Sequence, residues 1–65
     1  MENTRELRRL TPTDVRNLRE LRGLAQKDLA DALGVSVAMI SYLETGKRPI
    51  TFGYELALLR ILRGR

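Results

Sequence analysis

The stretch QKDLADALGVSVAMISYLET, residues 26–45, decides the fold because two short helical patterns flank a glycine in it. The first pattern predicts a helix over residues 26–33, with three apolar residues on one side: Leu29, Ala30 and Leu33. Gly34 ends this pattern, since glycine takes up a left-handed turn conformation without strain. Ala30 is small, which suits a close crossing of two helices. The stretch therefore predicts two helices that pack across a tight turn.

The second helical pattern covers residues 37–45, and Ser36 before it is a good N-cap. Ile40 and Leu43 predict the inward side of this helix, and Gly46 closes it. Helical spacing then turns the other side outward, with these residues on it: Val37, Ala38, Ser41, Tyr42 and Thr45.

A helix is also predicted before this stretch, over residues 12–22. Thr11 can cap it, and Pro12 supplies a preset backbone angle in its first turn. An apolar residue recurs every three positions along its inward side: Val15, Leu18 and Leu21. Gly23 offers the left-handed residue that stops the helix.

Thr51 can cap a last helix over residues 52–63, which carries two neighbouring apolar stripes. One stripe is Phe52, Leu56, Leu59 and Leu62, and the other is Tyr54, Leu58 and Ile61. Residues 1–10 are predicted to form an arm or a short helix, and residues 11–65 a single domain. The sequence thus predicts an all-α fold, a compact bundle of four to five helices.

The composition limits the chemistry that the chain can perform. Its 65 residues include no Cys and no His, so disulfides and the usual transition-metal ligands are excluded. The same absence weighs against an enzyme, because general bases and thiolate nucleophiles draw first on these residues. No apolar run approaches the roughly 20 residues that span a bilayer, and the N-terminus has no apolar signal core, so we expect a cytoplasmic, nucleoid-associated protein. The net charge of +4 fits a polyanionic partner.

Two segments resemble a known family: LRELRGLAQKDLADALGVS, residues 18–36, and ISYLETGKRP, residues 40–49. They are similar to the Cro and repressor type of phage and bacterial regulators, also called the xenobiotic-response-element type, over about residues 15–62. The resemblance implies a lambda-repressor-like bundle in which residues 26–45 form a helix-turn-helix. It also implies a regulator that binds double-stranded DNA as a dimer, without a cofactor.

The resemblance implies phosphate contacts around the two helices. In such proteins a glutamine that opens the first helix binds a backbone phosphate, and Gln26 stands at this position. Exposed N–H groups and the helix dipole favour an anion there, although a plain solvated glutamine stays an alternative. Ala25 departs from the family pattern of Ser or Thr, so a cap worth about 1 kcal/mol is missing. Lys47 and Arg48 form a basic turn that either holds phosphates or is solvated, and further phosphate candidates are Lys27, Ser36 and Thr45.

Arg19 and Glu44 match a buried ion pair of the same family. The pair ties the helix over residues 12–22 to the end of the helix over residues 37–45. Neither residue is then expected to touch DNA.

The outward residues predicted to enter the major groove are short or apolar: Val37, Ala38, Ser41 and Tyr42. Bidentate reading of a base needs Arg, Asn or Gln, and this set has none. One explanation is that specificity comes from thymine methyl groups, from DNA shape and from candidate arm contacts: Arg5, Arg8 and Arg9. The other is that Val37, Met39 and Tyr42 form a protein-binding face and DNA binding is lost.

The last predicted helix is apolar around more of its circumference than one core stripe needs. Either it is a generously packed helix, or its second side forms a twofold dimer through Tyr54, Leu58, Ile61 and Leu62. A dimer predicts an inverted-repeat operator with half-sites about 34 Å apart. The favoured function is a homodimeric repressor or activator that acts by occupancy and, in activation, touches RNA polymerase. The alternative is a protein-binding module, such as an antitoxin or antiactivator partner.

Overall fold

The computed structural model describes residues 9–63, and this part of the chain is all-α. It contains the four helices α2 (Pro12–Leu21), α3 (Gln26–Leu33), α4 (Val37–Thr45) and α5 (Phe52–Arg63). The predicted fold class and the predicted bounds of the last three helices are confirmed. The first helix ends at Leu21, one residue before the predicted end, because Arg22 is its C-cap. No helix in the described range is long and apolar enough to cross a membrane.

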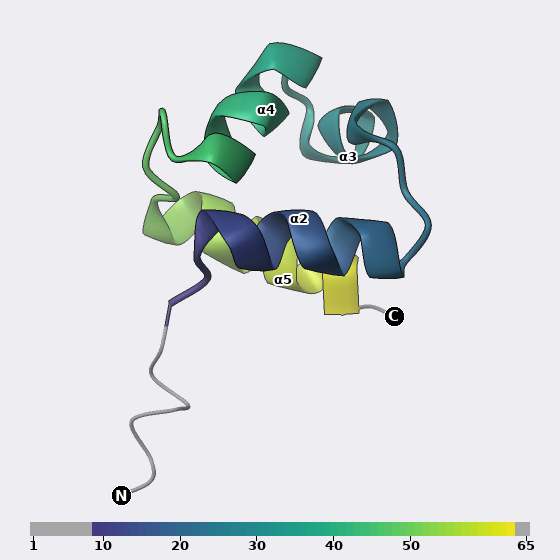
Figure 1. Cartoon of the computed structure of the whole chain (residues 1–65), viewed down its shortest axis with the longest axis horizontal. Helices are drawn as coiled ribbons and strands as arrows, with labels where there is room; N and C mark the ends of the chain where they lie inside the picture. Colours follow the sequence, from purple (N-terminus) through teal and green to yellow (C-terminus); the bar gives the residue numbers. More distant parts are fainter. Residues whose placement is uncertain (1–8, 64–65) are drawn as a thin grey trace, which may run out of the picture.

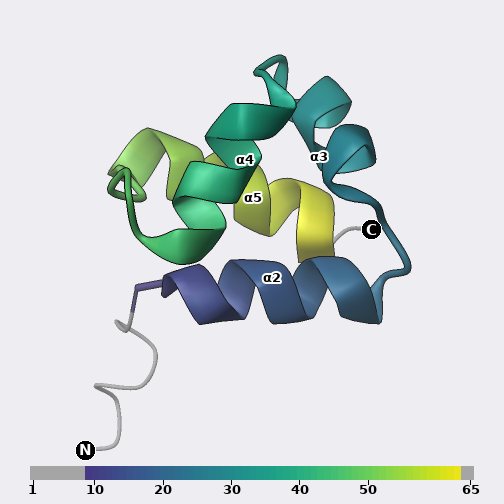
Figure 2. The same cartoon turned by 45° about the horizontal axis from the view of Figure 1, so that its top comes forward.

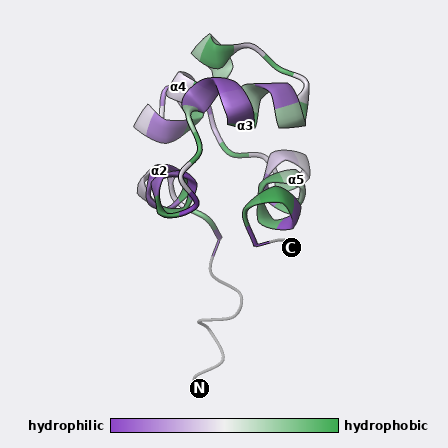
Figure 3. Ribbon diagram, turned by 90° about the vertical axis from the view of Figure 1, so that its right-hand side faces the viewer, coloured by the Kyte–Doolittle hydropathy of each residue, from purple (hydrophilic) through white to green (hydrophobic). Residues whose placement is uncertain are grey.

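The helices form two layers. α3 and α4 lie together on one side, and α2 and α5 run beside each other beneath them (Figure 1 and Figure 2). Figure 3 shows α2 and α5 nearly end-on, as two coils side by side below the α3 and α4 layer. Hydrophobic side chains from all four helices meet between the layers.

Local capping groups set the helix starts, as the sequence predicted. The Thr11 hydroxyl accepts a hydrogen bond from the Asp14 amide at 3.1 Å, and the Asp14 carboxylate accepts one from the Thr11 amide at 3.0 Å. Ser36 and Thr51 cap α4 and α5 through their hydroxyls, which accept the amides of the third residue along. Each cap satisfies a backbone donor that a helix leaves unpaired. The starts of α2, α4 and α5 are therefore local properties of the sequence.

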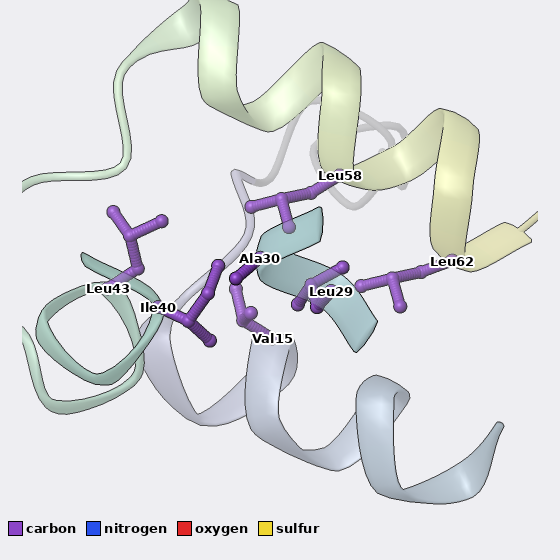
Figure 4. Packing of buried hydrophobic residues seen from close by; sticks show 7 residues of the cluster. All are labelled: Val15, Leu29, Ala30, Ile40, Leu43, Leu58 and Leu62. Carbon is purple, nitrogen blue, oxygen red and sulfur yellow. The ribbon is translucent and has the colours of Figure 1, made fainter. Parts of the chain in front are cut away.

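The core is one cluster drawn from all four helices, and Figure 4 shows its members: Val15, Leu29, Ala30, Ile40, Leu43, Leu58 and Leu62. Both α5 leucines are nearly inaccessible, with Leu58 at 0% and Leu62 at 2% exposure. The prediction that these two leucines face a partner subunit is therefore wrong. The inward side of α5 lies between the two predicted stripes, so each stripe has one leucine in the core.

The flanks of α5 are accordingly more open than the core. Phe52 is 66% exposed and Leu56 is 51% exposed on one flank. Tyr54 and Ile61 are half-buried and pack against the core from the other flank. α5 therefore does carry more apolar side chains than its core side needs, but the most exposed of them are Phe52 and Leu56, which were not among the residues expected at a dimer interface.

Candidate nucleic-acid interface

The turn between α3 and α4 holds these helices in a fixed relation. The amides of Gly34 and Val35 both donate to the Ala30 carbonyl, at 2.8 and 3.0 Å. Gly34 has a φ of +75°, a backbone conformation that would be strained for a residue with a side chain. Ala30 is 1% exposed and lies close to Ile40 in the core, where a larger side chain would push the helices apart (Figure 4). The packing therefore fixes where the outer side of α4 points.

The outer side of α4 is open along its length. Val37 is 43% exposed and Tyr42 is 38% exposed, with Ala38 and Thr45 also exposed and Ser41 half-buried. The Thr45 hydroxyl donates to the Ser41 carbonyl at 2.9 Å. Met39 is half-buried and packs against the core, so it adds little to this surface. The structure thus brings the four predicted base-reading residues onto one accessible side: Val37, Ala38, Ser41 and Tyr42.

The Arg19–Glu44 ion pair is present and nearly buried, with side-chain exposures of 10% and 4%. Arg19 donates twice to the carboxylate, from Nε to Oε2 at 2.6 Å and from Nη2 to Oε1 at 3.2 Å. Its Nη1 donates to the Leu24 carbonyl at 2.7 Å. The pair therefore joins α2 and the loop after it to the last turn of α4.

Gln26 belongs to the same network. Its Nε2 donates to Glu44 Oε1 at 3.1 Å. The sequence did not reveal this contact, since the amide and the carboxylate meet only once α3 and α4 are packed. Gln26 is half-buried and opens α3, and Ala25 before it supplies no side-chain cap. Gln26 thus stands at the start of α3, as expected, but part of its hydrogen-bonding capacity is used inside the protein.

The network shifts the proton affinities of the ion pair. The hydrogen bonds that Arg19 donates to Glu44 are the main cause that raises the pKa of Arg19 above its already high value, against the effect of burial. Burial alone would raise the pKa of Glu44, but the hydrogen bonds from Arg19 and Gln26 and the charges of Arg19 and Arg16 outweigh it. The pKa of Glu44 is therefore lower than its ordinary value of 4.5, and the pair is ionised at neutral pH.

The basic turn after α4 packs back on Tyr42. The Lys47 ammonium lies 5.8 Å from the centre of the Tyr42 ring, within cation–π range. The Arg48 amide donates to the Tyr42 carbonyl at 3.3 Å. Both basic side chains are exposed and stand beside the outer side of α4. Two further phosphate candidates already have partners: Lys27 pairs with Asp31 at 3.1 Å, and the Ser36 hydroxyl accepts the Met39 amide.

Arg9 is held within the domain instead of projecting as an arm. Its Nε donates to Glu55 Oε1 at 2.7 Å and its Nη2 donates to the Ile50 carbonyl at 2.9 Å. The Leu10 amide donates to the second Glu55 oxygen at 2.7 Å. We therefore correct the expected role of Arg9 to a structural one. The other two candidate arm residues, Arg5 and Arg8, lie outside the described residues.

Sequence reasoning missed two structural polar residues. Glu55 is 7% exposed and anchors residues 9–10. The sequence carries no clear signal for this role, because the inward side of α5 is decided only by packing. Arg22 donates from Nη1 to the Leu62 carbonyl at 2.5 Å, which ties the end of α2 to the end of α5. No local pattern around Arg22 points to that contact.

Comparison with known proteins agrees with this geometry. The family model described as Helix-turn-helix matches residues 15–64, which is most of the chain. No curated protein and no solved structure matches the chain. With the turn, the open α4 surface and the buried ion pair in place, the chain belongs to the helix-turn-helix family of Cro and repressor type, whose members bind double-stranded DNA and regulate transcription.

Proposed function

We propose that this protein is a sequence-specific regulator that binds an inverted-repeat operator as a homodimer. α4 enters the major groove with its outer side toward the bases, and phosphate contacts flank it on both sides. The observation that carries the proposal is the accessible outer side of α4, bounded by Gln26 at the start of α3 and by Lys47 and Arg48 after α4. A helix presented in this way matches the docking geometry of helix-turn-helix proteins.

The main phosphate contacts in this proposal come from two basic side chains, one amide side chain and the backbone of α3. Lys47 and Arg48 supply charge after α4, and Gln26 supplies a neutral donor at the start of α3. The Asp28 carboxylate accepts the Ala25 amide at 2.8 Å, but Ala25 offers no side-chain acceptor to the amides that follow in the first turn of α3, so these amides favour an anion. Lys27, Ser36 and Thr45 are secondary contacts, since each already has a partner within the protein.

The experiment that tests DNA binding measures affinity against salt concentration. We expect Lys47→Ala and Arg48→Ala each to weaken binding to all duplexes alike and to flatten the logarithmic salt slope by about 0.9. Arg60→Ala is the matched control, because Arg60 is exposed on α5, away from this surface, and its slope should equal that of the wild type. Equal slopes for all three variants would contradict the phosphate contacts. Failure of the wild type to bind any duplex, with one protein co-purifying, would support a protein-binding module instead.

Base recognition in this proposal uses methyl groups and DNA shape. Val37 and Ala38 pack on thymine methyls, Ser41 makes one hydrogen bond of either sense, and Tyr42 donates to a base or a phosphate. Replacing the contacted thymines by uracil removes only the methyl group, so it should weaken specific binding. Unchanged affinity would leave DNA shape as the main source of specificity.

The dimer surface needs to be revised from the one that the sequence suggested. Tyr54 and Ile61 stay candidates, because they are half-buried on one flank of α5. A hollow on that flank adds the end of α3, and it is lined by Leu33, Thr51, Gly53, Tyr54 and Ala57. In this arrangement residues 11–65 form the DNA-binding domain, and a second copy of the chain is seated in this hollow. Such a dimer would repress by covering a promoter or activate by touching RNA polymerase beside one, in the cytoplasm at the nucleoid.

A further inference from the structure

The buried carboxylate of Glu44 accepts hydrogen bonds from two different residues. Arg19 occupies both oxygens, and Gln26 Nε2 shares Oε1 at 3.1 Å. The Glu44 side chain is 4% exposed, so these protein donors take the place of water. The carboxylate is thus a fixed point to which one end of the Gln26 side chain is attached.

The chemistry of the carboxylate fixes which end of the amide is attached. An ionised carboxylate only accepts hydrogen bonds, whereas the glutamine amide has a donor end and an acceptor end. Turning the amide over would bring Gln26 Oε1 against Glu44 Oε1, an unfavourable contact of two acceptors. Since the pKa of Glu44 is lowered, the carboxylate stays ionised at neutral pH and the amide keeps one orientation.

This orientation leaves the second N–H of Gln26 Nε2 unused by Glu44. Gln26 is the first residue of α3, beside first-turn amides to which the N-cap Ala25 offers no side-chain acceptor, so a donor placed there adds to a surface already suited to a phosphate. The negative charge of Glu44 does not repel that phosphate strongly, because Arg19 neutralises it. A side chain that is already ordered also loses less conformational entropy on binding.

We propose that Glu44 is a positioning residue for DNA binding: through its hydrogen bond to Gln26, it turns the remaining amide N–H of Gln26 toward a DNA phosphate. The inference rests on the proposed function, in which Gln26 contacts the backbone. It gives the ion pair between Arg19 and Glu44 a second role besides joining α2 to α4.

A double-mutant cycle on a mixed-sequence 30-base-pair duplex separates positioning from a purely structural role. Gln26→Met keeps the size of the side chain and removes the donor, so we expect it to weaken binding about tenfold. In a Glu44→Gln background the amide is no longer held one way, and Gln26→Met should cost less than about twofold. If Glu44 only stabilises the fold, Gln26→Met costs the same factor in both backgrounds, which would overturn the proposal. All four proteins are compared well below the melting temperature of the least stable one.

Nuclear magnetic resonance gives a readout that does not depend on affinity. Gln26 is the only glutamine in the chain, so ¹⁵N-glutamine labelling yields one side-chain amide pair. On adding the duplex, we expect one of its two protons to shift and the proton bonded to Glu44 to stay. Equal shifts of both protons, or no shift while α4 backbone amides respond, would overturn the positioning role alone. If no α4 amide responds to the duplex, the proposed DNA binding fails and this inference fails with it.

Discussion

Two arginines of α2 that lie three residues apart in the sequence differ in how deeply they are buried. Arg16 pairs with Glu20 at 3.3 Å, with side chains 62% and 52% exposed. Arg19 pairs with Glu44 at 2.6 Å, with side chains 10% and 4% exposed. Water screens the charges of the exposed pair, so removing Arg16 leaves Glu20 solvated and costs little stability. Removing Arg19 instead leaves the buried Glu44 carboxylate without its counter-charge. Residues with the same chemistry on one helix therefore differ in their effect on stability.

We expect Arg19→Ala to lower the free energy of unfolding by about 3 to 5 kcal/mol. Arg16→Ala is the matched control on the same helix, and its effect should stay below about 1 kcal/mol. Urea unfolding followed by circular dichroism measures both values. Coincident unfolding curves for Arg19→Ala and the wild type would show that the ion pair does not hold α2 to α4.

The lowered pKa of Glu44 makes the stability of the fold depend on pH. The unfolded chain binds the proton at a higher pH than the folded chain, so this carboxylate stabilises the fold fully above its ordinary value of 4.5. That stabilisation is lost as the pH falls from about 4.5 through the folded pKa. We expect the difference in unfolding free energy between the wild type and Glu44→Gln to shrink over this range. A difference that stays constant from about pH 6 to pH 3 would contradict the shift.

At the scale of the elements, local chemistry explains why the helix bounds were predictable. Thr11, Ser36 and Thr51 accept amides three residues away, and glycines end α3 and α4, so these signals lie within one short window. The inward side of α5 was not predictable in the same way. Its apolar residues cover more than half of the circumference, and only packing against the other helices selects Leu58 and Leu62 for the core. The Gln26–Glu44 contact was missed for the same reason, because it forms across the packed helices.

The two sides of α5 can be distinguished by matched leucine substitutions. Leu58→Ala should lower the free energy of unfolding by about 2 to 5 kcal/mol, because it leaves a cavity in the core. Leu56→Ala removes the same atoms from a side chain that is 51% exposed, so its effect should stay within about 0.5 kcal/mol. Thermal and urea unfolding of the two variants measure the difference. A larger loss of unfolding free energy for Leu56→Ala than for Leu58→Ala would contradict this assignment of the core side of α5.

At the scale of the whole molecule, the two-layer arrangement restricts how a dimer can bind one DNA duplex. In the proposed complex the α3 and α4 layer faces the DNA, so two copies would have to associate sideways to keep both α4 helices toward the same duplex (Figure 3). The flank of α5 with Tyr54 and Ala57 meets this requirement, because its hollow also includes Leu33 at the end of α3. The flank with Phe52 and Leu56 lies on the opposite side of α5.

We therefore expect Ala57→Glu to convert a dimer into a monomer without unfolding it, because a charge would be buried against the partner without a counter-ion. Leu56→Glu introduces the same charge on the other flank and should leave the dimer intact. Sedimentation equilibrium at high micromolar concentration compares the two variants with the wild type.

On DNA, the wild type should favour two half-sites about 34 Å apart over a single half-site. Adding five base pairs between the half-sites should abolish this advantage, since the second half-site then faces away from the second subunit. Ala57→Glu should bind both spacings equally weakly. A monomeric wild type, or a dimer broken by Leu56→Glu alone, would refute this arrangement of the two subunits.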